Sequence, residues 1–381
     1  MGGIMTEKIN FENYRNSWVH EKNSCGNKQQ LHAEEIFTLL QKGQSVWLGP
    51  NLSIYQSEVL DAKNGPPSLF FRSGGTSGNA KWIRHSEKSV SFAVSGLLES
   101  LGVEEISSWC CLPLNHVGGM MQIFRAIASG GKVYFSSYRK LFDEIPGELM
   151  QSQWISLVPT QLNRLITSSI ACKNLRQFKG IFIGGAALSE KLAQRARNEG
   201  IPLFPCYGMS ETAGMITLLN SHSFEKGIGG VGKVLPHAFM SVNTVTNRIS
   251  VKAKSISLNA HQEGQGGEEW LDTPDYGYHD PEGNWFIEGR LDRMIVTGGE
   301  KVNPHFIEKV IQEFNSVDEC LVCGVEDQDW GQRIVAYLTP TNIELNELKE
   351  FVQKRLESHS IPKDWQLVNQ LPLTEMGKPK N

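Results

Sequence analysis

Short apolar runs alternate with helical patterns through the first half of the chain, and each run ends at a glycine, a proline or a polar loop. The apolar runs lie at 68–71, 109–114, 154–158 and 180–183. The helical patterns lie at 116–129, from a cap at Thr160 onwards, and at 188–199. Repetition of strand, loop and helix is typical of an α/β fold with a largely parallel sheet. In such sheets ligands bind where the strand ends meet glycine loops.

The pattern changes twice in the second half of the chain. Between 228 and 270, short alternating runs and many glycines favour β-hairpins. After Arg290, helical patterns at 306–314 and 344–358 and strands at 319–325 and 334–338 form a compact α+β unit. We therefore predict a large N-terminal α/β domain with a β subdomain over 1–291. A small C-terminal α+β domain is expected over 292–381.

Composition limits the classes of protein to which the chain can belong. It has 381 residues, 40% hydrophobic and 20% charged, which excludes a disordered protein. Its net charge of −4 gives no overall field to attract nucleic acid or an anionic membrane. We find no apolar run long enough to span a membrane and no secretory signal over 1–20, so the seven cysteines favour a reduced, cytoplasmic protein. Cys320 and Cys323 lie in an apolar run and are expected in a buried strand, not at a metal site.

A glycine-rich loop follows the first apolar run. It contains Ser73, Gly74, Gly75, Thr76, Ser77 and Gly78 and ends at Lys81. Glycines let the backbone approach an anion closely, while hydroxyls, N–H groups and a lysine can bind phosphate oxygens. A plain Ser/Gly surface loop is the alternative.

Two further groups of residues suggest nucleotide chemistry. Tyr207–Thr212 places the Glu211 carboxylate beside hydroxyls at a strand end, which suits Mg²⁺; alternatively, Ser210 caps a helix there. Asp275 could hold a ribose diol or be an ordinary turn aspartate. Lys378 lies near the end of the chain, where a lysine is usually a solvated tail residue.

Together and in this order, the motifs resemble those of the adenylate-forming superfamily of acyl-CoA synthetases, luciferases and adenylation domains. The matching elements are the loop 73–81, Tyr207–Glu211, Thr273–Asp275, Gly289–Asp292 and Pro372–Lys378. The phosphate loop departs from the family pattern at Gly74, Ser77 and Ala80. The stretches 112–119 and 298–304 look most like o-succinylbenzoate–CoA ligases of menaquinone and phylloquinone synthesis, of the compact cyanobacterial type.

The resemblance implies a reaction in two halves, with ATP, Mg²⁺ and CoA. ATP and a carboxylic acid give an acyl-adenylate, and the CoA thiol then displaces AMP. The implied ATP- and AMP-binding residues are Ser73, Gly74, Gly75, Thr76, Ser77, Gly78, Lys81, Gly184, Gly185, Ala186, Tyr207, Gly208, Ser210, Asp275 and Arg290. Glu211 is the implied Mg²⁺ ligand, and Lys378 is the lysine that reaches the carboxylate and α-phosphate. The resemblance also implies that the C-terminal domain is a mobile lid that rotates about Asp292, and that Gly298 and Gly299 line the CoA channel.

The acyl site is expected around the helical pattern at 116–129. By resemblance, His116 lies at the wall between the acyl pocket and the CoA tunnel, with Gly119 nearby; a satisfied core histidine is the alternative. Arg125 is a single cation in an apolar run, so it either reaches solvent at the helix edge or meets an anion. A second carboxylate on the substrate would supply that anion.

Three other functions stay open at this stage. The first is a ligase for a different carboxylic acid. The second is a degenerate nucleotide-binding homologue, which the altered phosphate loop suggests. The third is an enzyme that loads a carrier protein instead of free CoA, although we see no fused carrier sequence. Neither the acid nor the oligomeric state follows from the sequence.

Overall fold

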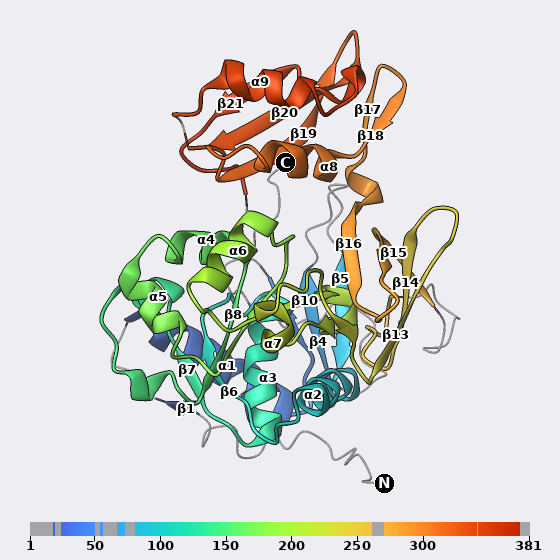
Figure 1. Ribbon diagram of the computed structural model, residues 1–381. Helices are drawn as coiled ribbons and strands as arrows, with labels where there is room; N and C mark the ends of the chain where they lie inside the picture. Colours follow the sequence, from blue (N-terminus) through green and yellow to red (C-terminus); the bar gives the residue numbers. More distant parts are fainter. Residues whose placement is uncertain are drawn as a thin grey trace.

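The computed structural model describes residues 18–19, 24–49, 54–55, 67–72, 81–260, 270–340 and 342–373. A large N-terminal domain carries a smaller C-terminal domain above it, and a β subdomain lies at the side, between β12 and the C-terminal domain in sequence (Figure 1). The predicted α/β fold with two domains is therefore confirmed.

An eight-stranded sheet forms the centre of the large domain, in the order β1-β7-β6-β8-β9-β10-β11-β12. Its strands are β1 (Trp18–Val19), β6 (Ser107–Cys110), β7 (Val133–Phe135), β8 (Gln153–Leu157), β9 (Gly180–Ile183), β10 (Leu203–Met209), β11 (Gly214–Leu218) and β12 (Lys233–Val234). The pairs from β1 to β10 are parallel, and β11 and β12 are antiparallel additions.

Helices cover both faces of this sheet, as parallel strands require. They are α1 (Ser24–Gln41), α2 (Glu87–Leu101), α3 (Val117–Ser129), α4 (Pro159–Leu165), α5 (Ser169–Leu175), α6 (Glu190–Asn198) and α7 (Ser221–Glu225). One core joins α1, α2 and α3 to a smaller sheet, and another joins α4, α5 and α6 to the other face of the large sheet. The smaller sheet has the order β3-β2-β4-β5, with β2 (Val46–Leu48), β3 (Ile54–Tyr55), β4 (Ser68–Arg72) and β5 (Trp82–Ser86).

The β subdomain and the C-terminal domain follow in sequence. The subdomain is an antiparallel sheet of β13 (Ala238–Val242), β14 (Arg248–Ala253), β15 (Leu271–His279) and β16 (Trp285–Arg290). The C-terminal sheet contains β17 (Ile295–Thr297), β18 (Glu300–Val302), β19 (Glu319–Asp327), β20 (Gly331–Thr339) and β21 (Asp364–Leu367), and α8 (Pro304–Gln312) and α9 (Leu345–Gln353) pack on it. The turn η7 (Leu291–Arg293) lies between the two sheets, where the domain boundary is predicted.

Three local predictions need correction. The strand at 109–114 ends at Cys110, and α9 ends at Gln353, not at 358. Thr160 does not cap α4, because the helix begins at Pro159 and Val158 occupies the cap position. Proline is favoured at the first helical position, where its missing N–H costs nothing.

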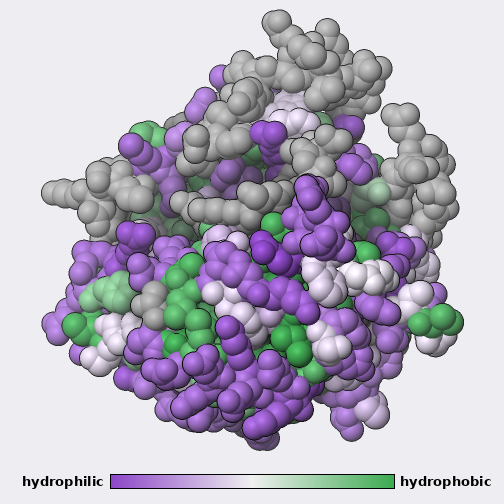
Figure 2. Space-filling model, turned by 90° about the horizontal axis from the view of Figure 1, so that it is seen from above, coloured by the Kyte–Doolittle hydropathy of each residue, from purple (hydrophilic) through white to green (hydrophobic). Residues whose placement is uncertain are grey.

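The buried-strand interpretation of the cysteine pair is confirmed, since Cys320 is 7% exposed in β19 and Cys323 follows in the same strand. Seen from above, the coloured part of the surface is largely hydrophilic, with hydrophobic groups between hydrophilic side chains (Figure 2). Among the helices that the structure describes, we find none with both the length and the apolar character needed to cross a bilayer.

Candidate active site

The carboxyl ends of β9 and β10 bring two predicted segments side by side. Because these strands are parallel and pair Pro205 with Ile183, Gly184–Ala186 after β9 lies beside Cys206 and Tyr207 in β10. A side chain at Gly184 would place its Cβ 2.9 Å from the Cys206 sulfur. The predicted adenine and acyl segments therefore meet at one edge of the sheet.

Asp275 lies at the centre of a hydrogen-bonded group. The Tyr207 hydroxyl donates to its Oδ2 at 2.6 Å, and Arg290 lies directly across from it in β16, with Nη1 3.7 Å from Oδ1. Asp275 is 6% exposed inside β15, so the turn-aspartate alternative is wrong. Burial and the Asp275 charge both raise the pKa of Tyr207 well above its ordinary value, so Tyr207 remains a hydrogen-bond donor.

Ser210 and Glu211 lie in a tight turn directly after β10. The turn η6 (Ser210–Thr212) begins after Met209, which occupies the cap position that the alternative gave to Ser210. The Thr212 hydroxyl accepts from the Met209 N–H at 3.1 Å and lies 2.6 Å from the Gly214 carbonyl oxygen. Gly208 is required here, because a Cβ would lie 2.0 Å from the Gly214 oxygen.

The turn presents one carboxylate, that of half-buried Glu211. Within the described ranges, no group of three or more His, Cys, Asp or Glu side chains could hold a metal ion. Mg²⁺ nevertheless needs few protein ligands, since it is commonly held by one or two carboxylates together with substrate phosphates and waters. Glu211 therefore fits a magnesium ion that arrives with a nucleotide.

Arg125 belongs to α3, and its side chain is buried. It is 4% exposed; its Nη1 lies 3.4 Å from the Ser156 hydroxyl, and its guanidinium carbon lies 5.1 Å from the Phe182 ring centroid. Burial lowers its pKa to about 10, so it is still charged at neutral pH. Among the residues that the structure describes, no carboxylate forms an ion pair with it. The snorkelling alternative is therefore wrong, and the partners that the described residues give this buried charge are neutral, the Ser156 hydroxyl and the Phe182 ring.

Three other residues lie in α3 or at its cap position. His116 is half-buried at the cap position of α3. Gly119 has a packing reason, because a Cβ would lie 2.1 Å from the Pro113 carbonyl oxygen, and its role at the substrate stays a prediction. Gln122 was missed by sequence reasoning: it is 1% exposed, and neither amide atom has a described partner.

Some predicted residues lie outside the described residues, and others are placed away from this edge of the sheet. Ser73–Ala80 and Lys378 belong to the first group, while Lys81, directly before β5, is exposed. Gly298 and Gly299 form the turn between β17 and β18, and a Cβ at Gly298 would meet only Trp330 of the same domain. This hairpin lies in the C-terminal domain, well apart from α3 (Figure 1).

His85 is the second residue that sequence reasoning missed. Its Nε2 lies 2.7 Å from the Ser210 carbonyl oxygen, and its ring is 1% exposed. Burial lowers its pKa to about 4, so the ring is neutral at neutral pH. Alternation along β5 places this side chain on the buried face, but no local pattern indicates that it reaches a turn 125 residues further along the chain.

Family models match both parts of the chain. The AMP-binding enzyme model matches residues 56–277, and the model for the AMP-binding enzyme C-terminal domain matches residues 307–378. A 2-succinylbenzoate–CoA ligase of Listeria monocytogenes is 31% identical over 324 residues, covering 82% of this chain and 68% of that protein. A 2-succinylbenzoate–CoA ligase of Bacillus pumilus is 30% identical, and the match covers 80% of this chain and 65% of that enzyme.

Solved structures give the same result. The o-succinylbenzoate CoA synthetase of Bacillus subtilis, solved with the acyl-adenylate OSB-AMP, has a TM-score of 0.67 and is 25% identical to this chain. That match covers 81% of this chain and 67% of the other. This chain thus spans about two thirds of the length of the relatives it matches. Together, the two matched models place the chain in the family of AMP-binding enzymes.

Proposed function

We propose that the chain is an AMP-forming acid–thiol ligase that activates o-succinylbenzoate with ATP and transfers the acyl group to CoA. The similar ligases of Listeria and Bacillus carry this name, and the Bacillus subtilis synthetase has been solved with OSB-AMP and with ATP and magnesium. Such a ligase belongs to menaquinone or phylloquinone synthesis, as the sequence resemblance implies. The substrates are small molecules, which fits a site built at the ends of strands.

Arg125 is the observation that carries the choice of acid. The Arg125 guanidinium is buried, and the described residues give it a hydroxyl and an aromatic ring as neighbours but no carboxylate in an ion pair. o-Succinylbenzoate has two carboxylates, one of which is activated while the other remains free. The planar fork of arginine suits a carboxylate, and burial strengthens the pairing. A substrate with a single carboxylate would leave this charge unpaired.

The nucleotide would lie across the ends of β9, β10 and β15. Asp275, held by Tyr207 and Arg290, is suited to the ribose hydroxyls, and Gly184–Ala186 to the adenine. Ser210 would contact the α-phosphate and Glu211 the magnesium ion, which offsets the repulsion between the carboxylate and the triphosphate. Lys81, the loop 73–80 and Lys378 would add further contacts to the phosphates.

CoA transfer would use a second arrangement of the domains. His116 would form the wall toward the CoA tunnel, and Gly298 and Gly299 would line it after rotation of the C-terminal domain about Asp292. We also propose the residue roles given above, a domain boundary at 291/292, a mobile C-terminal lid and a cytoplasmic location. A ligase for another acid and a degenerate nucleotide-binding homologue are less favoured, because a buried Arg125 would suit a diacid and Asp275 is held by Tyr207 as a ribose site would require.

Pyrophosphate release tests the first half-reaction. The protein is mixed with Mg²⁺, ATP and, in turn, o-succinylbenzoate and a panel of other carboxylic acids, without CoA. We expect a burst of pyrophosphate with o-succinylbenzoate. Equal bursts with several unrelated monoacids would favour a different acid, and no burst with any acid would favour a degenerate homologue.

A further inference from the structure

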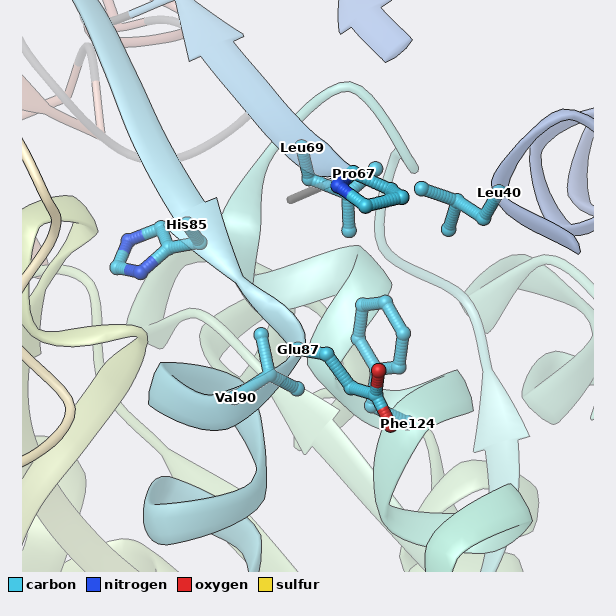
Figure 3. A pocket seen from close by; sticks show the side chains of 7 residues that line it. All are labelled: Leu40, Pro67, Leu69, His85, Glu87, Val90 and Phe124. Carbon is cyan, nitrogen blue, oxygen red and sulfur yellow. The ribbon is translucent and has the colours of Figure 1, made fainter. Parts of the chain in front are cut away.

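His85 lies on the strand that leaves the phosphate loop. Strand β5 begins at Trp82, directly after that loop, and pairs antiparallel with β4, so that His85 faces Leu69 across the ladder. Figure 3 shows the imidazole on β5, turned away from the Leu40 and Pro67 side chains. A small cavity of about 60 Å³, lined mainly by apolar side chains that include Leu40 and Pro67, lies on the side that the ring turns away from. The ring therefore has an apolar environment there and a polar contact elsewhere.

Two hydrogen bonds fix the ring. The Ser210 carbonyl oxygen can only accept, so the proton must be on Nε2, which donates to it at 2.7 Å. Nδ1 lies 3.2 Å from the hydroxyl of Ser89 in the first turn of α2. The ring is thus held at both nitrogens and spans from α2 to the turn that carries Glu211.

A second set of hydrogen bonds joins strand β5 to the same turn through residues 257–259. The Ser257 N–H donates to the Glu211 carbonyl oxygen at 2.7 Å, and the Leu258 N–H donates to the Arg84 carbonyl oxygen at 2.8 Å. The Asn259 side chain accepts from the Arg84 N–H at 2.9 Å and donates to the Trp82 carbonyl oxygen at 2.6 Å. Strand β5 and the Ser210–Glu211 turn are therefore parts of one hydrogen-bonded unit.

We propose that His85 is a positioning residue that fixes the Ser210–Glu211 turn against β5. The inference rests on the proposed function, because it takes Glu211 to hold the Mg²⁺ that arrives with ATP. The Ser210 carbonyl oxygen accepts a hydrogen bond from His85, and the Glu211 carbonyl oxygen accepts one from Ser257. Because these two bonds hold the backbone of the turn, they set the direction of the Glu211 side chain. Losing the His85 bond should weaken the grip on Mg²⁺-ATP more than the grip on AMP, which lacks the β- and γ-phosphates.

Two substitutions of His85 by amide side chains distinguish the loss of the hydrogen bond from the loss of the ring's volume. In His85→Gln the amide nitrogen can reach the place of Nε2 and donate to Ser210. In His85→Asn the amide is one methylene shorter and reaches only the place of Nδ1. Binding of Mg²⁺-ATP and of AMP is measured by calorimetry for wild type and both variants. We expect His85→Asn to lose about tenfold in Mg²⁺-ATP affinity, on the order of one hydrogen bond, with AMP affinity nearly unchanged.

His85→Gln should recover most of the lost affinity. Wild-type Mg²⁺-ATP binding in a folded His85→Asn protein, or equal losses for ATP and AMP, would overturn the inference. If His85→Asn does not fold, Asn259→Ala is tested in its place, because losing this exposed side chain removes hydrogen bonds from the same unit. Unchanged Mg²⁺-ATP binding in Asn259→Ala would overturn the inference as well. A wild-type protein that binds no Mg²⁺-ATP would instead contradict the proposed function itself.

Discussion

The Arg125 guanidinium tests the choice of acid at the scale of a single residue. We predict that Arg125→Leu raises the KM for o-succinylbenzoate by about 10- to 150-fold, because one charge-assisted hydrogen-bonded pair contributes roughly 1.5–3 kcal/mol. The KM for ATP should change little. Steady-state assays of thioester formation measure both constants.

Two controls accompany this prediction. Arg139→Leu removes an exposed arginine and should leave the KM for the diacid unchanged. 3-Benzoylpropionate keeps the succinyl chain but lacks the ring carboxylate, so its KM should be the same for wild type and Arg125→Leu. If the diacid KM is also unchanged in Arg125→Leu, Arg125 does not read the substrate.

Individual residues could be predicted where their chemistry is local. Asp275 and Glu211 were identified by their motifs, but the sequence could not show that Asp275 lies in a strand, bonded to Tyr207. Arg125 was recognisable as a cation in an apolar run, whereas its burial depends on strands β8 and β9, which lie far along the chain. His85 and Gln122 carry no local signal, because their partners or their isolation arise only from tertiary packing.

Helix α2 provides a test at the scale of elements. Gly96 lies inside this helix, where Ala would ordinarily stabilise by about 1 kcal/mol. A Cβ at Gly96 would lie 2.1 Å from Nδ1 of His237, which is 6% exposed. We predict that Gly96→Ala lowers the free energy of unfolding, since overpacking costs about 1–3 kcal/mol. Urea unfolding measures the change.

A double-mutant cycle isolates the cause of that change. In a His237→Ala background the clash is absent, and Gly96→Ala should then be neutral or stabilising. The packing explanation fails if Gly96→Ala destabilises both backgrounds equally, or if it stabilises the wild type.

Elements were predicted best where a strong pattern coincided with strong burial. Strands β8 and β9 and helix α3 match their patterns closely, because an apolar strand between two helical layers has one stable place in a parallel sheet. Element ends were predicted less well. Strand β6 ends at Cys110 although the apolar run continues, because Leu112 to Leu114 pack as a loop under Gly119.

The whole molecule is held in one arrangement by contacts between its domains. Lys191 on α6 donates from Nζ to the carbonyl oxygens of Asn315 and Val317, at 2.7 and 2.6 Å. The hairpin with Gly298 and Gly299 lies apart from α3 in this arrangement (Figure 1). We therefore expect the C-terminal domain to rotate before CoA transfer.

The hinge at Asp292 gives the corresponding prediction. Asp292→Pro fixes φ near −65° and should block rotation, so pyrophosphate release with acid and ATP persists while CoA thioester formation is lost. Asp292→Ala is the matched control, because it removes the bond from Arg290 Nε at 2.8 Å and leaves the backbone free. Quench-flow separates the two half-reactions. Full turnover in Asp292→Pro would place the hinge elsewhere.

One competition assay tests the central claim most directly. The protein is incubated with Mg²⁺, ATP, CoA and equal amounts of o-succinylbenzoate and 3-benzoylpropionate, and thioesters and nucleotides are quantified by mass spectrometry. We predict o-succinylbenzoyl-CoA as the main thioester, with AMP formed in equal amount. The proposed function is contradicted if 3-benzoylpropionyl-CoA forms equally well, if ADP replaces AMP as the nucleotide product, or if neither thioester forms.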